Sequence, residues 1–407
     1  MTYQSQSNGY VAFKAQSAKG SVASGGSGFV LRIAGGPGAK VTKNAYGSNE
    51  VRRDGMRSRG RHGLRKVAGS YTVEVSIDHM DNLYEAVFQG TWATALALSE
   101  SDFTSLAIAS NVITLGSGSP ISLGLRVGDV IRLTNMSTAA NNSKNLRITA
   151  LDATTITIAA GDVLTDQSAD TACNITRPGQ KLICPAAGAA VKTYWTLEEY
   201  DADLDLTEIV SDVIFHMLKF SMQPDGMVIC EIGFTGTGQF STASAGSAPT
   251  FTSPAEATGV PLACVDALIC FNSTDMVDLT SWDLTIDRGA VAPGVIASVY
   301  SPDVFTGNMS VSMNFGMLRS DYAKMTAFLA ETACTMQVLA VENESEPKDF
   351  LSLYVPNFTL GGVDKSPLSK EAGPRTQTIS IPADLVGKDV SGGGFDPTMV
   401  KLQVSNS

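Results

Sequence analysis

An internal duplication constrains the fold of this chain more than any other feature of its sequence. Residues 67–77 alternate apolar and polar side chains as a β-strand does, and residues 81–88 follow with the pattern of a short helix. Residues 305–315 and 320–329 repeat a glycine, a small polar residue, an alternating strand, a short gap and a helix in the same order. The sequence therefore predicts two related units in one chain.

Each copy ends in two more strand patterns. In the first copy, residues 210–222 precede residues 227–233 across a Pro-Asp-Gly turn. In the second copy, residues 350–360 precede residues 376–381 across a loop of glycine, lysine and proline. We expect each of these two pairs to form an antiparallel hairpin.

Unequal spacing within the two copies locates an inserted unit. The interval from Gly69 to Tyr194 is 125 residues, whereas the interval from Gly307 to Gln337, its apparent counterpart, is 30, a difference of 95. Small residues dominate the extra segment, and its strand-like runs lie at residues 112–115, 129–133, 146–149 and 155–158. Short strands separated by turns favour a small β-barrel or sandwich.

The predicted fold is mainly β, with two tandem sandwich or barrel domains, each with one short helix, and a small all-β inserted domain. The predicted boundaries are residues 1–92 with 188–240 for the first domain, 93–187 for the insert, 241–262 for a linker, 263–386 for the second domain and 387–407 for a C-terminal tail. The linker is rich in small residues and proline. The tail is weakly patterned, and we expect it to dock on a neighbour or to remain mobile.

Charge is segregated along the chain. The net charge is −11, but residues 52–66 contain seven of the 29 lysines and arginines against one acid, so this segment carries +6 and the remainder −17. The basic residues are Arg52, Arg53, Arg57, Arg59, Arg61, Arg65 and Lys66. The segment has no aromatic residue to stack a base, which disfavours single-stranded nucleic acid. We prefer a loop that docks on acidic faces of identical subunits; a merely solvated loop and a nucleic-acid patch are the alternatives.

Acidic residues alternate with other residues after the helix of each copy. The first set is Glu199, Asp201, Asp203 and Asp205, and the second is Glu342, Glu344 and Glu346. In an extended chain each set would lie on one face, which is costly unless the face is solvated or opposes a basic partner. The first set also resembles a calcium loop, but Leu206 occupies the position that requires glycine.

Catalytic, metal and cofactor patterns are absent from the sequence. The three histidines form no HExxH motif, the six cysteines have no CxxC spacing, and no GxSxG motif occurs. Residues 35–40 lack the spacing of a phosphate-binding loop and are expected to form a turn. No secretory signal pattern and no run of eighteen apolar residues occurs. We therefore expect no enzyme activity, cofactor, metal or membrane span.

The order of these parts resembles the tail tube protein of long, non-contractile-tailed (siphovirus-type) bacteriophages. The resemblance rests on the strand around Gly69 preceded by basic residues, the helix at residues 82–88 and the duplicated β-rich halves. Residues 125–133, 141–150 and 153–158 are similar to a module often inserted in that family. The first 25 residues and the glycine-rich tail match nothing in it.

The resemblance implies a structural virion protein made in the host cytoplasm. Subunits of this family join their inner sheets into rings, and the rings stack into a tube through which the genome is ejected. The long loop between early strands, here about residues 35–65, reaches the adjacent ring. Two copies in one chain imply a trimeric, pseudo-hexameric ring, with a true hexamer as the alternative. The implied partners are the chain itself, the tape measure protein and the tail terminator and tip proteins.

Electrostatics suggests how such a conduit would work. An acidic lining repels DNA phosphates over the screening distance of about 8–10 Å, so some of the alternating carboxylates are candidates for the lumen, and the basic segment is a candidate for contacts between rings. The insert is expected on the tube exterior. A phage receptor-binding or carbohydrate-binding β-protein is the competing class, but the three tryptophans, which would line its groove, are far apart in the sequence.

Overall fold

The computed structural model describes residues 3–78, 80–244, 246–342, 347–370, 372–388 and 394–405. The described residues are mainly in antiparallel β-sheets, as the sequence predicted. Three short α-helices accompany the strands: α1 (Asp81–Phe88), α2 (Glu100–Phe103) and α3 (Ala323–Leu329). Thus α1 and α3 confirm the predicted helix of each copy. None of the described helices is long and apolar enough to span a membrane.

The first half is a sandwich that shares one long strand between its two layers. Its strands are β1 (Gly9–Ala15), β2 (Phe29–Leu31), β3 (Ile33–Tyr46), β4 (Arg61–Glu74), β14 (Trp195–Asp201), β15 (Leu206–Met222), β16 (Ile229–Gly236) and β17 (Phe240–Ala243). The N-terminal part of β15 pairs with β14 and β17, and its C-terminal part pairs with β16. The predicted hairpin of the first copy, β15 with β16, is confirmed.

The second half repeats these pairings. Its strands are β18 (Ala267–Phe271), β19 (Thr274–Asp275), β20 (Leu279–Asp287), β21 (Ala290–Val291), β22 (Phe305–Thr306), β23 (Ser310–Leu318), β24 (Cys334–Val341), β25 (Phe350–Phe358), β26 (Gly362–Lys365), β27 (Thr376–Ile381) and β28 (Lys401–Ser405). The order β20-β23-β27-β26 corresponds to β3-β4-β16-β15, and β18-β24-β25 corresponds to β1-β14-β15. Here the counterpart of β15 is divided into two strands, β25 and β26.

This division makes the second predicted hairpin wrong. Strand β25 pairs with β24 and β28, whereas β27 pairs with β23 and β26. Residues 359–361 carry the chain from one sheet to the other between β25 and β26. Strand β25 has the pattern of a buried strand and β27 that of a half-buried one. Such patterns specify burial but not the pairing partner.

The inserted segment forms a sheet with its own core. Its strands are β5 (Leu96–Leu98), β6 (Leu106–Ala109), β7 (Val112–Leu115), β8 (Val130–Thr134), β9 (Leu146–Leu151), β10 (Thr155–Ile158), β11 (Gln167–Asp170) and β12 (Asn174–Arg177). The four strands predicted here are therefore confirmed as β7 to β10. Phe103, Ile113, Ile148 and Ile175 belong to a buried cluster separate from the main core. Strand β13 (Gln180–Ile183) leaves this unit and pairs with β28 in a six-stranded sheet.

The tail and the linker are both packed against the rest of the chain. All five residues of β28 are buried, and β28 pairs with β25 and β13 of its own chain. In the linker, Phe251 is fully buried and its N–H donates to the Glu198 carboxylate at 2.9 Å. The linker segment is thus packed against the first half, and the tail contributes a buried strand to the six-stranded sheet. The predicted domain boundaries themselves remain predictions.

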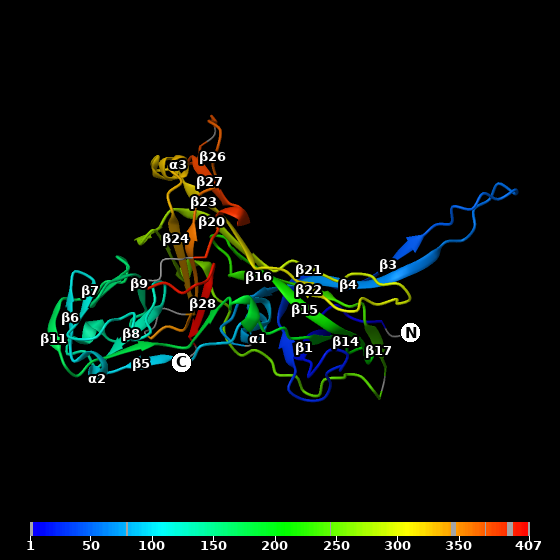
Figure 1. Ribbon diagram of the computed structural model, residues 1–407, viewed down its shortest axis with the longest axis horizontal. Helices are drawn as coiled ribbons and strands as arrows, with labels where there is room; N and C mark the ends of the chain where they lie inside the picture. The colour runs from blue at the N-terminus through cyan, green and yellow to red at the C-terminus, as the bar shows by residue number, and fades with distance from the viewer. Residues whose placement is uncertain are drawn as a thin grey trace.

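The two halves are fused into one twelve-stranded sheet. Strand β15 of the first half pairs antiparallel with β20 of the second, from Met217 opposite Asp287 to Met222 opposite Trp282. A single buried apolar cluster spans both halves. In Figure 1 the β3–β4 hairpin and the inserted unit project from opposite ends of the long axis of the molecule.

Candidate assembly surfaces

The β3–β4 hairpin, here called the arm, presents most of the predicted basic residues. Strands β3 and β4 pair from their bases to Tyr46 opposite Arg61, and residues 47–60 close the tip. At or beside the tip lie the exposed side chains of Arg52, Arg53, Arg57, Arg59 and Arg61. Arg52 forms an ion pair with Asp54 at 2.8 Å. The remainder of the tip is therefore a projecting, strongly basic surface.

Arg65 lies nearer the base of the arm and contacts the second half. Its backbone N–H donates to the Val299 carbonyl at 2.8 Å, and its guanidinium lies 5.3 Å from the centre of the Tyr300 ring. Lys66, beside it, is exposed. The basic segment is thus divided between an intrachain contact and a free tip.

The base of the arm corrects two expectations. Residues 35–65 are largely paired strands rather than one loop, and residues 35–40 lie within β3 instead of forming a turn. The strand register shifts between Ile33 and Gly35 and again between Gly35 and Gly38. Gly36 and Gly38 have positive φ, and a Cβ on Gly36 would lie 2.7 Å from the Ser70 carbonyl. The glycines therefore allow bulges in a strand that lies close to β4.

The first acidic set does not share one face. Glu199 and Asp201 belong to β14, but residues 202–205 form the turn to β15, so Asp203 and Asp205 follow no strand alternation. Asp203 accepts hydrogen bonds from the Ser5 N–H and the Asn8 amide. The turn replaces the extended strand that the alternating pattern predicted.

The Glu199 carboxylate forms its hydrogen bonds within the first half. Its carboxylate accepts hydrogen bonds from the Tyr71 hydroxyl and from the Ala39 N–H, the latter at 3.0 Å. Burial and the neighbouring Glu199 raise the pKa of Tyr71 well above its usual value. In the second acidic set, Glu342 is half-buried and accepts from the Val260 N–H at 3.3 Å, while Glu344 and Glu346 lie outside the described residues.

A different set of carboxylates gathers on the twelve-stranded sheet. Along one cross-strand row, Glu74, Ile229, Ser221, Asp283 and Asn314 are successive partners. The next row is Thr72, Glu231, Lys219, Thr285 and Ser312, and a third contains Asp287 opposite Ser310. We call this surface the polar face. Alternating residues such as Val73, Phe220, Leu284 and Val311 point to the opposite side, into the core.

The polar face is predominantly acidic. Glu74, Glu231, Asp283 and Asp287 lie on it with Lys219 across the central strands. Asp283 accepts from the Ser221 hydroxyl at 2.6 Å, and Asp287 contacts His216 Nδ1 at 2.9 Å. Asp283 and Asp287 share β20, but Glu74 and Glu231 come from β4 and β16, so only the strand register brings all four acids together.

Among the described residues, one path of strands through this branched sheet ends at two open edges. The path β3-β4-β16-β15-β20-β23-β27-β26 ends at β3, which pairs only with β4, and at β26, which pairs only with β27. An unpaired strand edge can pair with another chain. Strand β20 corresponds to β3, and β26 corresponds to the C-terminal part of β15. The pairing of β15 with β20, here called the seam, therefore joins within one chain the counterparts of the two open edges.

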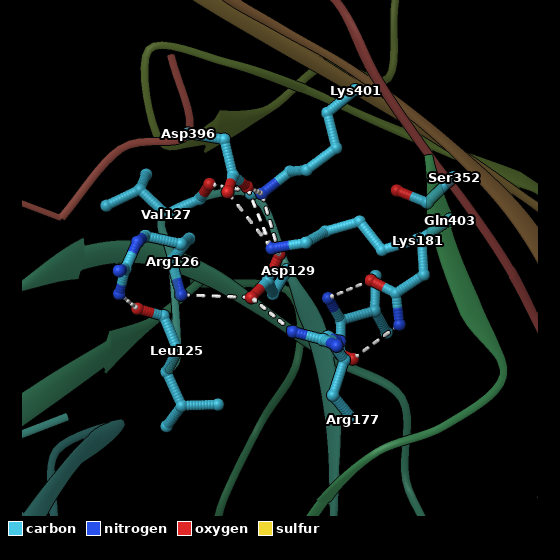
Figure 2. Close-up of polar contacts among 12 residues, drawn as sticks. Leu125, Arg126, Val127, Asp129, Arg177, Lys181, Ser352, Asp396, Lys401 and Gln403 are labelled. Carbon is cyan, nitrogen blue, oxygen red and sulfur yellow. Dashed lines mark hydrogen bonds and ion pairs between the residues drawn. The ribbon is translucent and has the colours of Figure 1, made fainter. Parts of the chain in front are cut away.

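The inserted unit docks on the six-stranded sheet that contains β28, β25, β24 and β18 of the second half, through buried polar contacts (Figure 2). Asp129 of the insert is fully buried and contacts Lys401 at 2.7 Å, Lys181 at 3.5 Å and Arg177 at 3.8 Å. Asp396 contacts Lys181 at 3.0 Å and Lys401 at 3.1 Å. Burial acts to raise the pKa of Asp396, but the two lysines outweigh it and hold the pKa below its usual value.

Neutral hydrogen bonds complete this interface. The Gln403 side chain of β28 exchanges two hydrogen bonds with the backbone of Val130, each at 2.9 Å, and the Gln337 amide donates to the Gly128 carbonyl at 3.1 Å. Val130 also packs with Leu339 and Phe350. The insert is therefore fixed to the second half, although the sequence places it inside the first.

The tryptophans form no binding groove. Trp195 and Trp282 are buried, and half-buried Trp92 donates its indole N–H to the Asp81 carbonyl at 3.4 Å. Within the described ranges, no three His, Cys, Asp or Glu side chains cluster as a metal site.

Comparison with known families matches residues 6–383 to the family described as "Phage tail tube protein". No curated protein matches the chain.

Proposed function

The chain belongs to the phage tail tube protein family, and from this membership we propose that it is the subunit that polymerises into a tube for DNA ejection from a siphovirus-type virion. The family implies a structural, non-enzymatic virion component. Synthesis in the host cytoplasm and contacts with the tape measure, tail terminator and tip proteins are parts of this proposal.

The observation that carries the proposal is the eight-strand path with two open edges. We propose that β26 of one chain pairs with β3 of the next, as β15 pairs with β20 within the chain. Three chains would close a barrel of 24 strands from six similar units. At about 4.8 Å per strand, its circumference would be roughly 115 Å and its diameter roughly 37 Å, before strand tilt widens it. Such a channel is wide enough for duplex DNA.

Electron microscopy of the purified protein tests this assembly. We expect stacked rings with threefold symmetry, six similar inner lobes and three outer projections, because each chain has two halves but one insert. Sixfold rings with six projections would overturn the trimer. Discrete monomers under all assembly conditions would overturn the tube.

The proposed lumen is lined by the polar face rather than by Glu199, Asp201, Asp203, Asp205 and the residues of the second set. This face is on the strands that would form the barrel, and its carboxylates would repel phosphates without binding them. The six-stranded sheet would form the outer layer of the tube, so the insert attached to it would decorate the exterior.

Charge reversal on the polar face gives a direct test of the lining. Glu74→Lys with Glu231→Lys is expected to leave tubes intact but to make them retain double-stranded DNA at low salt, with retention lost as salt rises. The measurement is DNA co-sedimentation with tubes across a salt series. Glu100→Lys with Asp152→Lys, two exposed acids of the insert, is the matched control. Equal DNA retention by both variants would contradict an inner position of the polar face.

A further inference from the structure

Helix α3 is much more exposed than its counterpart α1. Five of the eight residues of α1 are buried, including Tyr84 and Phe88. None of the residues of α3 is buried, and Leu329 at its C-terminal end is 74% exposed. Tyr322, just before α3, is 72% exposed. An isolated apolar residue at a surface needs no explanation, but the difference between two corresponding helices does.

The two helices occupy the same place in their halves. Helix α1 packs against β15, where the Tyr84 and Phe220 rings are 6.0 Å apart, and α3 packs against β26. Phe220 lies in the part of β15 that pairs with β20. Each helix therefore packs against the last strand of its own four-strand layer, which is β15 in β3-β4-β16-β15 and β26 in β20-β23-β27-β26.

The second half supplies part of the cover of α1. Just after β20, Arg288 donates from Nε to the Val87 carbonyl at 2.8 Å and from Nη2 to the Phe88 carbonyl. Thr306 of β22 accepts from the Gln89 amide at 3.1 Å. The chain that follows β20 thus crosses the seam and covers the end of α1; β13 covers another part of it.

We infer that the exposed side of α3, from Tyr322 just before its first residue to Leu329 at its C-terminal end, is a docking surface for the base of the arm of a second copy of this chain. The inference rests on the proposed β26–β3 seam. The first residues of β3 correspond to β20. Residues 36–43, which come next in β3, therefore correspond to the segment after β20 that begins with Arg288. They would therefore cross the seam between chains and cover α3 as Arg288 and its neighbours cover α1.

This surface is a contact within a ring, separate from any contact of the arm tip with another ring. The base of the arm carries Lys40 and Lys43, both exposed, and Glu331 is exposed beside the end of α3. These charges are complementary across the inferred contact.

Photocrosslinking in assembled tubes tests the inference. A benzophenone amino acid replaces Leu329 in tubes grown from equal amounts of isotope-labelled and unlabelled chains. We expect crosslinks from position 329 to residues 36–43, with the mixed labelling that marks two chains. The same probe at Val163, an exposed residue of the insert, should give no crosslink to residues 36–43.

The outcomes separate this inference from the proposed function. If rings form but position 329 crosslinks only within its own chain, or to a different part of another chain, the docking surface is wrong and the tube stands. If the unmodified protein forms no rings, the proposed function fails first.

A substitution gives a second readout. Leu329→Asp is expected to raise the protein concentration needed for ring formation about 10-fold, because an apolar contact would be lost. Val163→Asp should leave that concentration unchanged. Circular dichroism of the unassembled variants should match the parent, because both side chains are largely exposed; an unchanged assembly threshold for Leu329→Asp would overturn the inference.

Discussion

Replacing Asp129 with asparagine is expected to lower the free energy of unfolding by about 3–5 kcal/mol, the usual cost of removing one partner from a buried ion cluster. Asp129 and Asp396 together face three cations, Arg177, Lys181 and Lys401. The substitution would leave Asp396 alone to compensate all three. Burial already lowers the pKa of Lys181, so this environment disfavours an ammonium without a carboxylate.

The expected loss is located at the interface between the insert and the second half. Chemical denaturation of unassembled protein gives the overall change, and hydrogen exchange locates it. Amides of β8 and β28 should exchange faster in the variant, because Asp129 directly precedes β8 and Lys401 begins β28. Amides at the β15–β20 seam should be little affected.

Two further variants test whether the lost charge of Asp129 causes the loss of stability. Asp152→Asn changes an exposed acid of the same inserted unit and should alter stability by less than about 0.5 kcal/mol. Adding Lys401→Met to Asp129→Asn removes one uncompensated cation and should recover part of the loss, giving a coupling of about 1–3 kcal/mol in a double-mutant cycle. Strict additivity of the two substitutions would show that the charges at these positions do not interact.

The sequence was sufficient for local structure wherever periodicity was strong. It identified α1, α3 and four of the eight strands of the insert, β7 to β10, because apolar side chains recur there at the spacing of each element. It did not identify the partner of β25, because a continuously buried strand carries no information on which strand lies beside it. Pairing depends on residues that are distant in the sequence.

The buried strand β28 of the tail was not predicted, for a related reason. Lys401, Gln403 and Ser405 alternate with Leu402 and Val404, as in a strand with one face in water. The insert covers that polar face, so all five side chains are buried. Nothing in residues 401–405 alone could reveal this cover.

Of the two candidate surfaces, the sequence predicted the basic arm but not the acidic polar face. The basic arm was visible in the sequence because its charges are contiguous. The acidic polar face was not, because each of its strands contributes only one or two carboxylates and the register collects them. The alternating run from Glu199 to Asp205 ends in a turn, where Asp205 accepts a hydrogen bond from the Tyr200 hydroxyl and Asp203 accepts hydrogen bonds from the N-terminal segment.

Replacing residues 47–60 with Asn-Gly is expected to abolish stacking of rings while leaving the subunit folded. Tyr46 and Arg61 are the last paired residues of the arm, and Asn-Gly is a favoured two-residue connection between such strands. The side-chain hydrogen bonds of the described tip all lie within residues 48–58. Removing the described tip therefore breaks none of these side-chain hydrogen bonds to the rest of the subunit, because all of them lie within the tip.

The size of this effect follows from the charges that would be lost. Residues 47–60 contain four arginines; if exposed ion pairs contribute about 0.2–1 kcal/mol each, these four contribute roughly 0.8–4 kcal/mol per subunit contact, or about 4-fold to nearly 10³-fold in affinity. The measurement is tube length and sedimentable fraction, with rings counted by microscopy. Because the base of the arm is retained, rings should still close.

Charge variants separate the role of the arginines from that of the loop itself. Arg57→Glu, Arg59→Glu and Arg61→Glu together should prevent stacking at low salt, whereas the corresponding three Arg→Lys substitutions should largely preserve it. High salt should weaken stacking of the parent, because exposed charges are screened within about 8–10 Å. Unchanged polymerisation of the glutamate variant at every salt concentration would show that the basic tip does not hold the rings together, and stacking would then depend on another surface of the subunit.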